Sequence, residues 1–263
     1  MRAALDAVGA HPRFRDLPCI VDECDASVPA HWGFYDNANF AYRNSAYFPV
    51  FQCKLMKKLL DLSRAGAPHV AQATTWSFYF EGERFFEGTR SLFTAQGVEK
   101  PVLNAYRMLA RLGEVRIAAE SSHVWPLDRL DHSEPGMPEE IDALATMTGD
   151  RISVLAWRHA DDQYSTDAAP AEVTLRVEHL PFGGDRVRLR HWRIDARHSN
   201  SHSAWQAAGC PQDPSESELQ AIRARQGLEP LGAETLEPVQ RGSLTLRVSL
   251  PLPSVSLLEI LPA

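Results

Sequence analysis

The sequence has few cysteines and none of the spacings that signal a disulfide framework or a zinc site. Four occur in 263 residues, and they stand singly, with no Cys-x-x-Cys pair and no histidine at zinc-ligand spacing. This argues against a small disulfide-stabilised protein and against a structural zinc domain. We expect four free thiols, no metal and no cofactor; the cysteines are Cys19, Cys24, Cys53 and Cys210.

Long apolar runs are also missing. No segment reaches the roughly 20 apolar residues that a membrane-spanning helix needs. No positively charged leader followed by an apolar core opens the chain. We therefore expect no membrane association and a cytoplasmic protein, provided that no signal peptide precedes Met1.

Basic clusters are absent as well. The chain has 27 lysines and arginines against 34 aspartates and glutamates, and the basic residues are scattered singly. With a net charge of −7, we expect no nucleic-acid partner. The 44% hydrophobic content is typical of globular proteins and allows one large domain or two modest ones.

Helical and strand patterns alternate through the first 113 residues. The apolar run at 18–21 fits a buried strand of a parallel sheet, and 70–80 reads as a second strand. Apolar residues at helical spacing predict helices over 2–9, 40–62 and 102–112. This alternation is typical of a barrel or a doubly wound sheet.

After Gly113 the pattern changes to short segments in which apolar and polar residues alternate, separated by loops rich in Gly, Pro and Asp. Such a pattern predicts a β-sandwich. One helix interrupts it, because Ser215 is a capping residue and helical spacing follows as far as Leu228. The predicted strands are 115–119, 152–157, 173–179, 187–194, 244–250 and 255–260.

Glu23 is the first candidate for chemistry. Reactive groups of parallel α/β units lie just beyond the carboxyl ends of strands, and Glu23 follows the apolar run between Asp22 and Asp25. Crowded carboxylates repel one another, so burial would raise the pKa of at least one of them. The alternative interpretation is a solvated acidic loop or a helix cap.

A possible sugar-binding wall follows the second predicted strand. Trp76 offers a flat apolar face on which the C–H side of a sugar ring can stack, and Glu81 and Glu83 could accept its hydroxyl hydrogens. The alternative is that the aromatic residues of this region, phenylalanines above all, only pack the core.

Four blocks carry a family resemblance in their order and spacing. They are residues 17–27, residues 74–78, residues 92–101 with 105–109, and residues 192–201 with 204–205. They resemble, in that order, the nucleophile loop, the last barrel strand, the loop and helix that close the barrel, and a β-domain loop of the family 39 glycoside hydrolases. That family includes β-xylosidases and α-L-iduronidases.

The resemblance implies a fold of α/β plus all-β type. Residues 1–118 would be the C-terminal part of a (β/α)8 TIM barrel, its last strand-helix units. Residues 119–263 would be a β-sandwich domain with one inserted helix.

The resemblance also assigns roles residue by residue. Glu23 becomes the nucleophile of a retaining glycoside hydrolase, and Trp76 becomes a wall of the sugar subsite. Glu81 would accept hydroxyl hydrogens, while His31 and Tyr35, on the loop after Glu23, would border the substrate or simply pack that loop.

Further residues have two interpretations each. Arg90 lies where an iduronidase-like enzyme could meet a substrate carboxylate, but we favour an ordinary surface arginine. His198 and Asn200 could reach toward the barrel, but we favour a role in ordering a β-domain turn. The aromatic and asparagine content of the loop after Glu23 resembles bacterial β-xylosidases, so we expect a xyloside substrate and allow for a homo-oligomer.

One part of the catalytic machinery is not visible in the sequence. In the family, the acid/base glutamate follows an asparagine, and no Asn-Glu dipeptide occurs here. A full barrel takes about 250 residues, whereas the first half here holds about two strand-helix units. We therefore expect a fragment that lacks its general acid/base, with residues 1–113 not independently stable.

Two other classes of function compete with the enzyme fragment. The first is a non-catalytic carbohydrate-binding or interaction remnant, in which the sandwich binds glycan. The second is a thiol hydrolase that uses Cys24 with His31 or His69. The acidic neighbours of Cys24 would raise its pKa and keep the thiol protonated, which argues strongly against this option.

Overall fold

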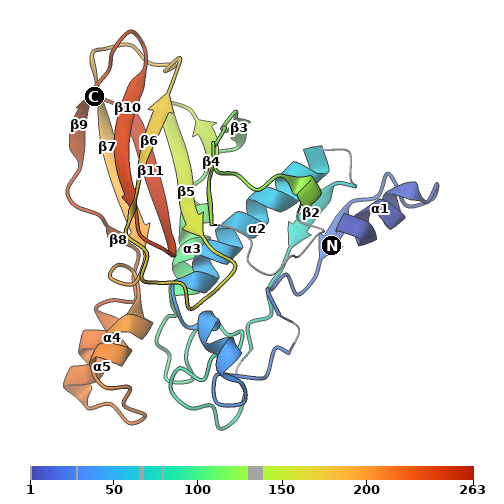
Figure 1. Ribbon diagram of the computed structural model, residues 1–263, viewed down its shortest axis with the longest axis vertical. Coiled ribbons are helices and arrows are strands. Elements are labelled where there is room, and N and C mark those ends of the chain that lie inside the picture. Colours follow the sequence, from blue (N-terminus) through green and yellow to red (C-terminus); the bar gives the residue numbers. More distant parts are fainter. Residues whose placement is uncertain (1, 28, 65–67, 79, 130–138) are drawn as a thin grey trace.

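The computed structural model describes residues 2–27, 29–64, 68–78, 80–129 and 139–263. Its largest feature is an antiparallel sheet in the order β3-β4-β5-β11-β7-β8, with β9 also paired to β7, and a two-stranded sheet of β6 and β10 lies over it (Figure 1). The strands are β3 (Val115–Ile117), β4 (Glu140–Thr148), β5 (Arg151–His159), β6 (Ala171–Val177), β7 (Arg186–Ile194), β8 (Glu229–Pro230), β9 (Thr235–Pro238), β10 (Leu244–Leu250) and β11 (Ser254–Pro262).

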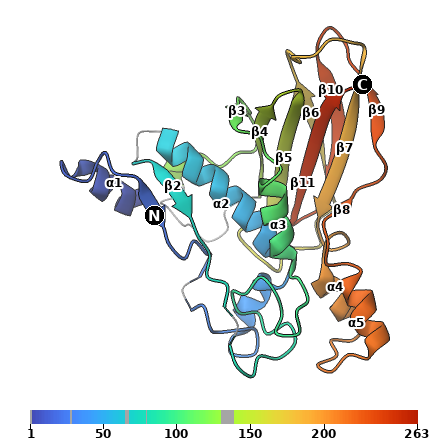
Figure 2. The same ribbon diagram turned by 180° about the vertical axis from the view of Figure 1, so that it is seen from behind.

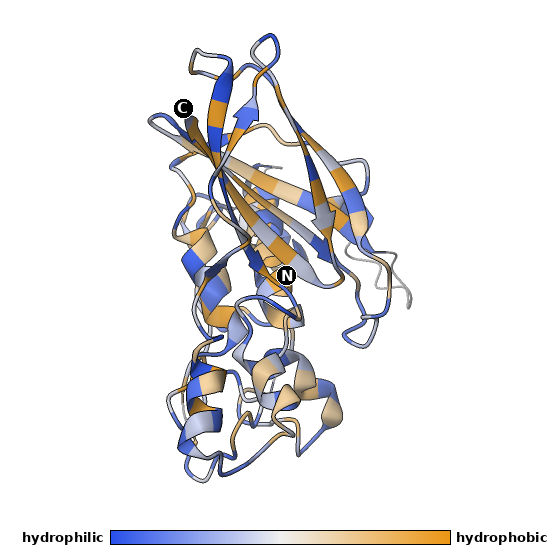
Figure 3. Cartoon of the chain, turned by 90° about the vertical axis from the view of Figure 1, so that its left-hand side faces the viewer, coloured by the Kyte–Doolittle hydropathy of each residue, from blue (hydrophilic) through white to orange (hydrophobic). Residues whose placement is uncertain are grey.

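An aliphatic core lies between the two sheets. Along β10, Leu244, Leu246, Val248 and Leu250 are buried and the residues between them are exposed, as expected for a strand with one solvated face. Figure 3 shows this alternation as successive hydrophobic and hydrophilic bands along the sandwich strands. In β11, by contrast, residues 254–260 are all buried, because this central strand is covered on both faces.

Two helices cover the opposite face of the large sheet (Figure 2). They are α2 (Tyr47–Arg64) and α3 (Pro101–Leu109), and proline opens α3 at a position where its missing N–H costs nothing. Val50 of α2 and Met108 of α3 share one core cluster with Trp157 of β5. Among the described helices, none has the length and apolar character needed to cross a membrane.

A small parallel pair of strands stands apart from the large sheet. β1 (Cys19–Val21) follows α1 (Arg2–Ala10) and pairs with β2 (Val70–Ala73). The described residues contain no closed barrel, so the predicted barrel is seen only as this pair with its helices. The prediction of a buried strand at 18–21 is wrong in its burial. β1 begins at Cys19, none of its three residues is buried, and Ile20 is 63% exposed because β2 is the only neighbour of β1 in the described chain.

Several predicted elements are shorter than expected. The helix predicted over 40–62 is split into the 3-10 helix η1 (Ala38–Arg43) and α2, and the Asn37 side chain caps η1 by accepting a hydrogen bond from Asn39 N. The strand predicted over 70–80 ends at Ala73, because its partner β1 ends at Val21.

Other elements were not predicted. β4, β8, β9 and the helix α4 (Ser201–Ala207) are additional, so the described part of the second half has two short α-helices rather than one. The predicted one is α5 (Glu216–Arg223), where Ser215 and Glu218 form a full capping box. β4 was not predicted from the sequence because two of its buried positions carry charged rather than apolar residues, Glu140 and Asp142.

The predicted boundary between residues 118 and 119 passes through a shared core. The cluster that contains Val50 and Met108 also contains Leu144, Leu155 and Leu257 from the sheet. The division into two domains therefore stays a prediction, and the structure adds that the two parts share apolar surface.

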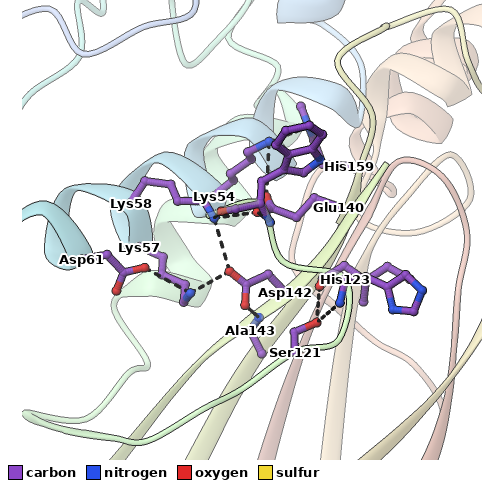
Figure 4. A network of polar contacts seen from close by, with 12 residues as sticks. Lys54, Lys57, Lys58, Asp61, Ser121, His123, Glu140, Asp142, Ala143 and His159 are labelled. Atoms are coloured by element: carbon purple, nitrogen blue, oxygen red, sulfur yellow. Dashed lines mark hydrogen bonds and ion pairs between the residues drawn. The ribbon is translucent and has the colours of Figure 1, made fainter. Parts of the chain in front are cut away.

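Charged side chains reinforce this contact between α2 and β4 (Figure 4). Lys54 and Lys58 pair with Glu140 at 3.2 and 2.6 Å, and Lys57 pairs with Asp142 at 2.7 Å. The two carboxylate side chains are 0% and 2% exposed. Buried carboxylates are tolerated only when they are paired in this way, so the ionic contact fixes the position of α2 on the sheet.

We predict that Glu140→Gln lowers the free energy of unfolding by about 3 kcal/mol, because it leaves Lys54 buried without its carboxylate partner and Lys58 with only Asp142 at 3.6 Å. Glu234→Gln is the matched control. Its carboxylate lies 2.6 Å from Arg190 but is 37% exposed, so the loss should stay below about 1 kcal/mol. Urea denaturation of both variants measures the difference, and equal losses would contradict the prediction.

Candidate active site

The carboxyl ends of β1 and β2 bring two of the candidate residues to one edge. The parallel ladder pairs Val21 with Ala73 and is prolonged by hydrogen bonds from Thr74 N to Val21 O at 3.0 Å and from Cys24 N to Thr74 O at 2.6 Å. Glu23 and Trp76 therefore follow neighbouring strands at the same end of the pair. This is the arrangement that the sequence predicted.

Glu23 has an unusual backbone conformation. Its φ is +53°, a left-handed conformation that is uncommon for residues other than glycine and often marks functional positions. The side chain is 48% exposed, and Oε2 lies 3.1 Å from Nη1 of Arg90. The chain thus turns sharply after β1 and presents a carboxylate that is ion-paired on one oxygen and open to solvent.

Arg90 is not the surface arginine that we favoured from the sequence. Its side chain is 2% exposed, and each of its three nitrogens has a protein partner. These are Glu23, the fully buried carboxylate of Asp25 at 3.0 Å and the carbonyl oxygen of Ser27. A buried carboxylate needs such a counter-charge, so Arg90 holds both acidic residues of the loop.

A second buried arginine supports the same loop. Arg43 is 0% exposed, and its Nη2 donates to Ser27 Oγ at 2.7 Å. The Tyr42 hydroxyl lies 2.6 Å from the same Oγ and donates to Asp25 Oδ1 at 3.3 Å. Both residues belong to η1, which the sequence presented as the start of a regular helix, so their role was missed and nothing in the pattern signals it.

Lys100 is buried beside the segment that carries Arg90. It is 1% exposed, and its Nζ donates to the Thr89 carbonyl oxygen at 2.7 Å. Burial lowers the pKa of Lys100 to about 7, an effect that the charges of Glu83 and Asp25 only partly oppose. The lysine therefore fixes the residue directly before Arg90 and changes its own charge near neutral pH.

The other predicted site residues have separate surroundings. The half-buried Trp76 ring packs edge-on against Phe78 at 5.3 Å, and its Nε1 has no hydrogen-bond partner in the described chain. His31 is exposed with its ring 6.2 Å from Phe80, and Glu81 is exposed in a turn. Within the described ranges, no hydrogen bond or ion pair joins these residues to Glu23.

Tyr35 is held by a different part of the chain. The Arg84 guanidinium stacks 3.5 Å from its ring centre, and its hydroxyl accepts a hydrogen bond from Gln212 Nε2 at 2.9 Å. Gln212 Oε1 also accepts from Phe85 N at 3.1 Å. The segment between α4 and α5 thus contacts the loop that leads to Arg90, although these elements lie more than 100 residues apart in the sequence.

The structure also shows the surroundings of His198 and Asn200, which had two interpretations each. His198 Nδ1 lies 2.9 Å from Asp195 Oδ1, and Asn200 caps α4 by accepting a hydrogen bond from Ser203 N. Both residues order the turn between β7 and α4, as favoured from the sequence.

The thiol-hydrolase alternative finds no support in the geometry. Burial and the charge of Asp25 raise the pKa of Cys24 to about 11, so its thiol stays protonated at neutral pH. No described histidine forms a hydrogen bond with it. All four cysteines are free, and the described residues contain no cluster of three or more His, Cys, Asp or Glu side chains that could hold a metal ion.

Comparisons with known proteins identify the class of protein and its family. The mixed α/β fold of this chain, with its antiparallel sheet, matches part of the solved structures of longer glycoside hydrolases. Residues 9–234 match the family model of the glycosyl hydrolases family 39, and the chain belongs to that family of O-glycosyl hydrolases.

Both curated relatives and solved structures are longer than this chain. It is 29% identical to human alpha-L-iduronidase over 269 residues, covering 95% of this chain and 39% of that protein, and 30% identical to the mouse enzyme over 172 residues, covering 63% and 25%. A GH39 enzyme from Xanthomonas axonopodis pv. citri superposes with a TM-score of 0.73 at 19% identity, covering 100% and 48%. A monomeric beta-xylosidase from Caulobacter crescentus CB15 gives 0.71 at 20%, covering 99% and 48%.

Lys100 generates a pH prediction. Below about pH 7 the lysine is protonated in both states, whereas above it the folded protein loses the proton that the unfolded chain keeps. The free energy of unfolding should therefore rise with pH from about 7 toward 9, with a slope approaching ~1.4 kcal/mol per unit. Lys100→Met and Lys100→Arg should both lose this rise, since neither side chain titrates there. Urea denaturation at several pH values measures this rise. A rise of the same size in the wild type and in both variants would contradict the prediction.

Proposed function

We propose that this chain carries the nucleophile of a retaining glycoside hydrolase, and that the nucleophile is Glu23. The observation that supports it most is the placement of this carboxylate directly after β1, in a left-handed turn and ion-paired with a buried arginine. Arg90 is ion-paired with Oε2, and no hydrogen bond or ion pair joins Oε1 to a described residue. We propose that Oε1 attacks the anomeric carbon while Arg90, ion-paired with Oε2, keeps the carboxylate oriented.

Retaining hydrolysis also needs a second carboxyl group about 5 to 5.5 Å from the first, which protonates the leaving oxygen and then activates water. No Asn-Glu dipeptide occurs in the sequence, so we propose that this general acid/base lies outside these 263 residues. In this proposal β1 and β2 are the last strands of a TIM barrel. The exposure of Ile20 and the match to less than half of each longer solved structure support it.

The substrate-binding residues of the proposal are those that follow the same strand ends. Trp76 would stack on the sugar through the exposed part of its half-buried ring. His31 and Glu81 have exposed side chains free to contact hydroxyl groups. Tyr35 is the weakest of the four, because Arg84 and Gln212 already occupy its ring and hydroxyl.

For the substrate we propose a β-xyloside. A neutral sugar needs no cationic partner, and the nitrogens of Arg90, the arginine beside Glu23, all have protein partners. The second candidate is an α-L-iduronide, which the names of the human and mouse relatives favour.

The alternative of a glycan-binding sandwich without catalysis has less support. Three cavities of about 320, 670 and 700 Å³ lie along the sandwich sheets. None of their lining residues in the described chain is a Trp, Tyr or Phe, so these cavities lack the aromatic faces on which sugars stack.

The role of Glu23 is tested in a longer polypeptide that supplies the second carboxyl group. Glu23→Ala should abolish hydrolysis of an aryl xyloside, because no nucleophile remains, and added azide should restore turnover by occupying the vacated position. Asp22→Ala is the matched control, since among the described residues its exposed carboxylate accepts a hydrogen bond from Thr74 alone and should be dispensable. Activity retained in Glu23→Ala, or lost without azide rescue, would disprove the assignment.

For the 263-residue chain alone we predict negligible hydrolysis of an aryl β-xyloside and of an aryl iduronide, because one of the two carboxyl groups is missing. Release of the aryl alcohol measures it directly. Turnover matching that of an intact family member would show that a second carboxylate of this chain acts as the acid/base.

A further inference from the structure

A separate pocket lies beside the loop that follows Glu23. It has a volume of about 370 Å³ and lies between η1, the start of α2 and the loop after β5. We propose that it is a second carbohydrate subsite, which binds a neutral pyranose unit. The ligand class rests on the proposed function, whereas the pocket itself does not depend on the role of Glu23. It is lined by Ala26, Asn39, Tyr42, Tyr47, Phe51, Asp161, Asp162, Gln163 and Tyr164.

The walls of the pocket are fixed before any ligand binds. Tyr47 is 9% exposed, and its ring packs 4.9 Å from the ring of His159. The opposite wall is fastened to η1, because Gln163 Nε2 donates to Asn39 O at 2.8 Å and the Tyr164 hydroxyl donates to Ala38 O at 3.3 Å. Such preorganisation reduces the entropy that a ligand must lose on binding.

Tyr164 supplies an aromatic face. Tyr164 is 61% exposed although its hydroxyl donates a hydrogen bond to Ala38 O, so the exposed part of the side chain is largely the apolar ring. An exposed aromatic ring that is anchored at its tip is a rigid platform for the C–H face of a sugar. The sandwich cavities have no such platform.

The charges of the pocket select a neutral ligand. Asp161 is exposed and has no hydrogen bond or ion pair with any described residue, and Asp162 Oδ1 accepts from Tyr164 N at 2.9 Å. No lysine or arginine is among the lining residues. Carboxylates accept hydrogen bonds from sugar hydroxyls, whereas a uronate or a sulfated sugar would be repelled.

The pocket is connected to the proposed catalytic loop. Ala26, on its wall, lies three residues after Glu23, and the Tyr42 hydroxyl is bonded to Asp25 and Ser27 of that loop. A sugar bound here would lie next to the proposed site, where a further unit of an oligosaccharide substrate is expected.

The test is a calorimetric titration of the 263-residue chain with xylobiose and, separately, with glucuronic acid. We expect binding of xylobiose only. Tyr164→Ala should raise its Kd about tenfold by removing the stacking face, and Asp161→Asn should raise it about fivefold. Phe14→Ala and Asp150→Asn are the matched controls, being an exposed aromatic and an exposed carboxylate outside the pocket, and should leave the Kd unchanged.

Absence of xylobiose binding, tighter binding of glucuronic acid, or a Kd that Tyr164→Ala does not change would overturn the proposal. Glu23→Gln separates it from the catalytic assignment. Binding should persist in this variant. If Glu23→Gln abolishes binding and Tyr164→Ala does not, the sugar occupies the site at Glu23, so the pocket proposal fails while the proposed function stands.

Discussion

The ionic contact between α2 and β4 is the constraint on which the rest of the structure depends. All four lysines of the sequence are buried, and three of them, Lys54, Lys57 and Lys58, share one face of α2 because they lie three and four residues apart. Glu140 and Asp142 lie two residues apart and so face the same side of β4. Unpaired, these buried charges would be costly, so helix and strand can pack only in the register that joins them (Figure 4).

Helix α2, held on the sheet by these ion pairs, also contacts the loop with Glu23. Gln52, two residues before Lys54, is fully buried and donates from Nε2 to the Cys24 carbonyl oxygen at 3.3 Å. From the other side, Arg90 clamps Glu23 and Asp25, and Lys100 holds the residue before Arg90. The loop with Glu23 is thus positioned by long-range polar contacts with both α2 and the 89–100 segment, and β1 alone, with three residues, could not fix it.

Local patterns predicted the features that depend on neighbours in sequence. The strand before Glu23, the proline that opens α3, the Ser215 cap and the alternating β10 all follow from such patterns. The features that were missed depend on distant partners. β4 carries inward carboxylates that make sense only beside the lysines of α2, and Arg90 is buried only because Asp25 and Glu23 meet it. The exposure of Ile20 likewise depends on which strands lie beside β1, and sequence periodicity does not report that.

The charges of two separate regions of the molecule support the neutral ligand that we propose. At the proposed catalytic loop the arginine that is ion-paired with Glu23, Arg90, also binds Asp25 and Ser27, so little positive charge is left for a substrate carboxylate. In the neighbouring pocket the free carboxylate of Asp161 adds negative potential. A uronate would meet a saturated arginine in one place and repulsion in the other. A neutral pentose avoids both costs, and this electrostatic argument favours a xyloside even though the curated relatives of similar sequence are iduronidases.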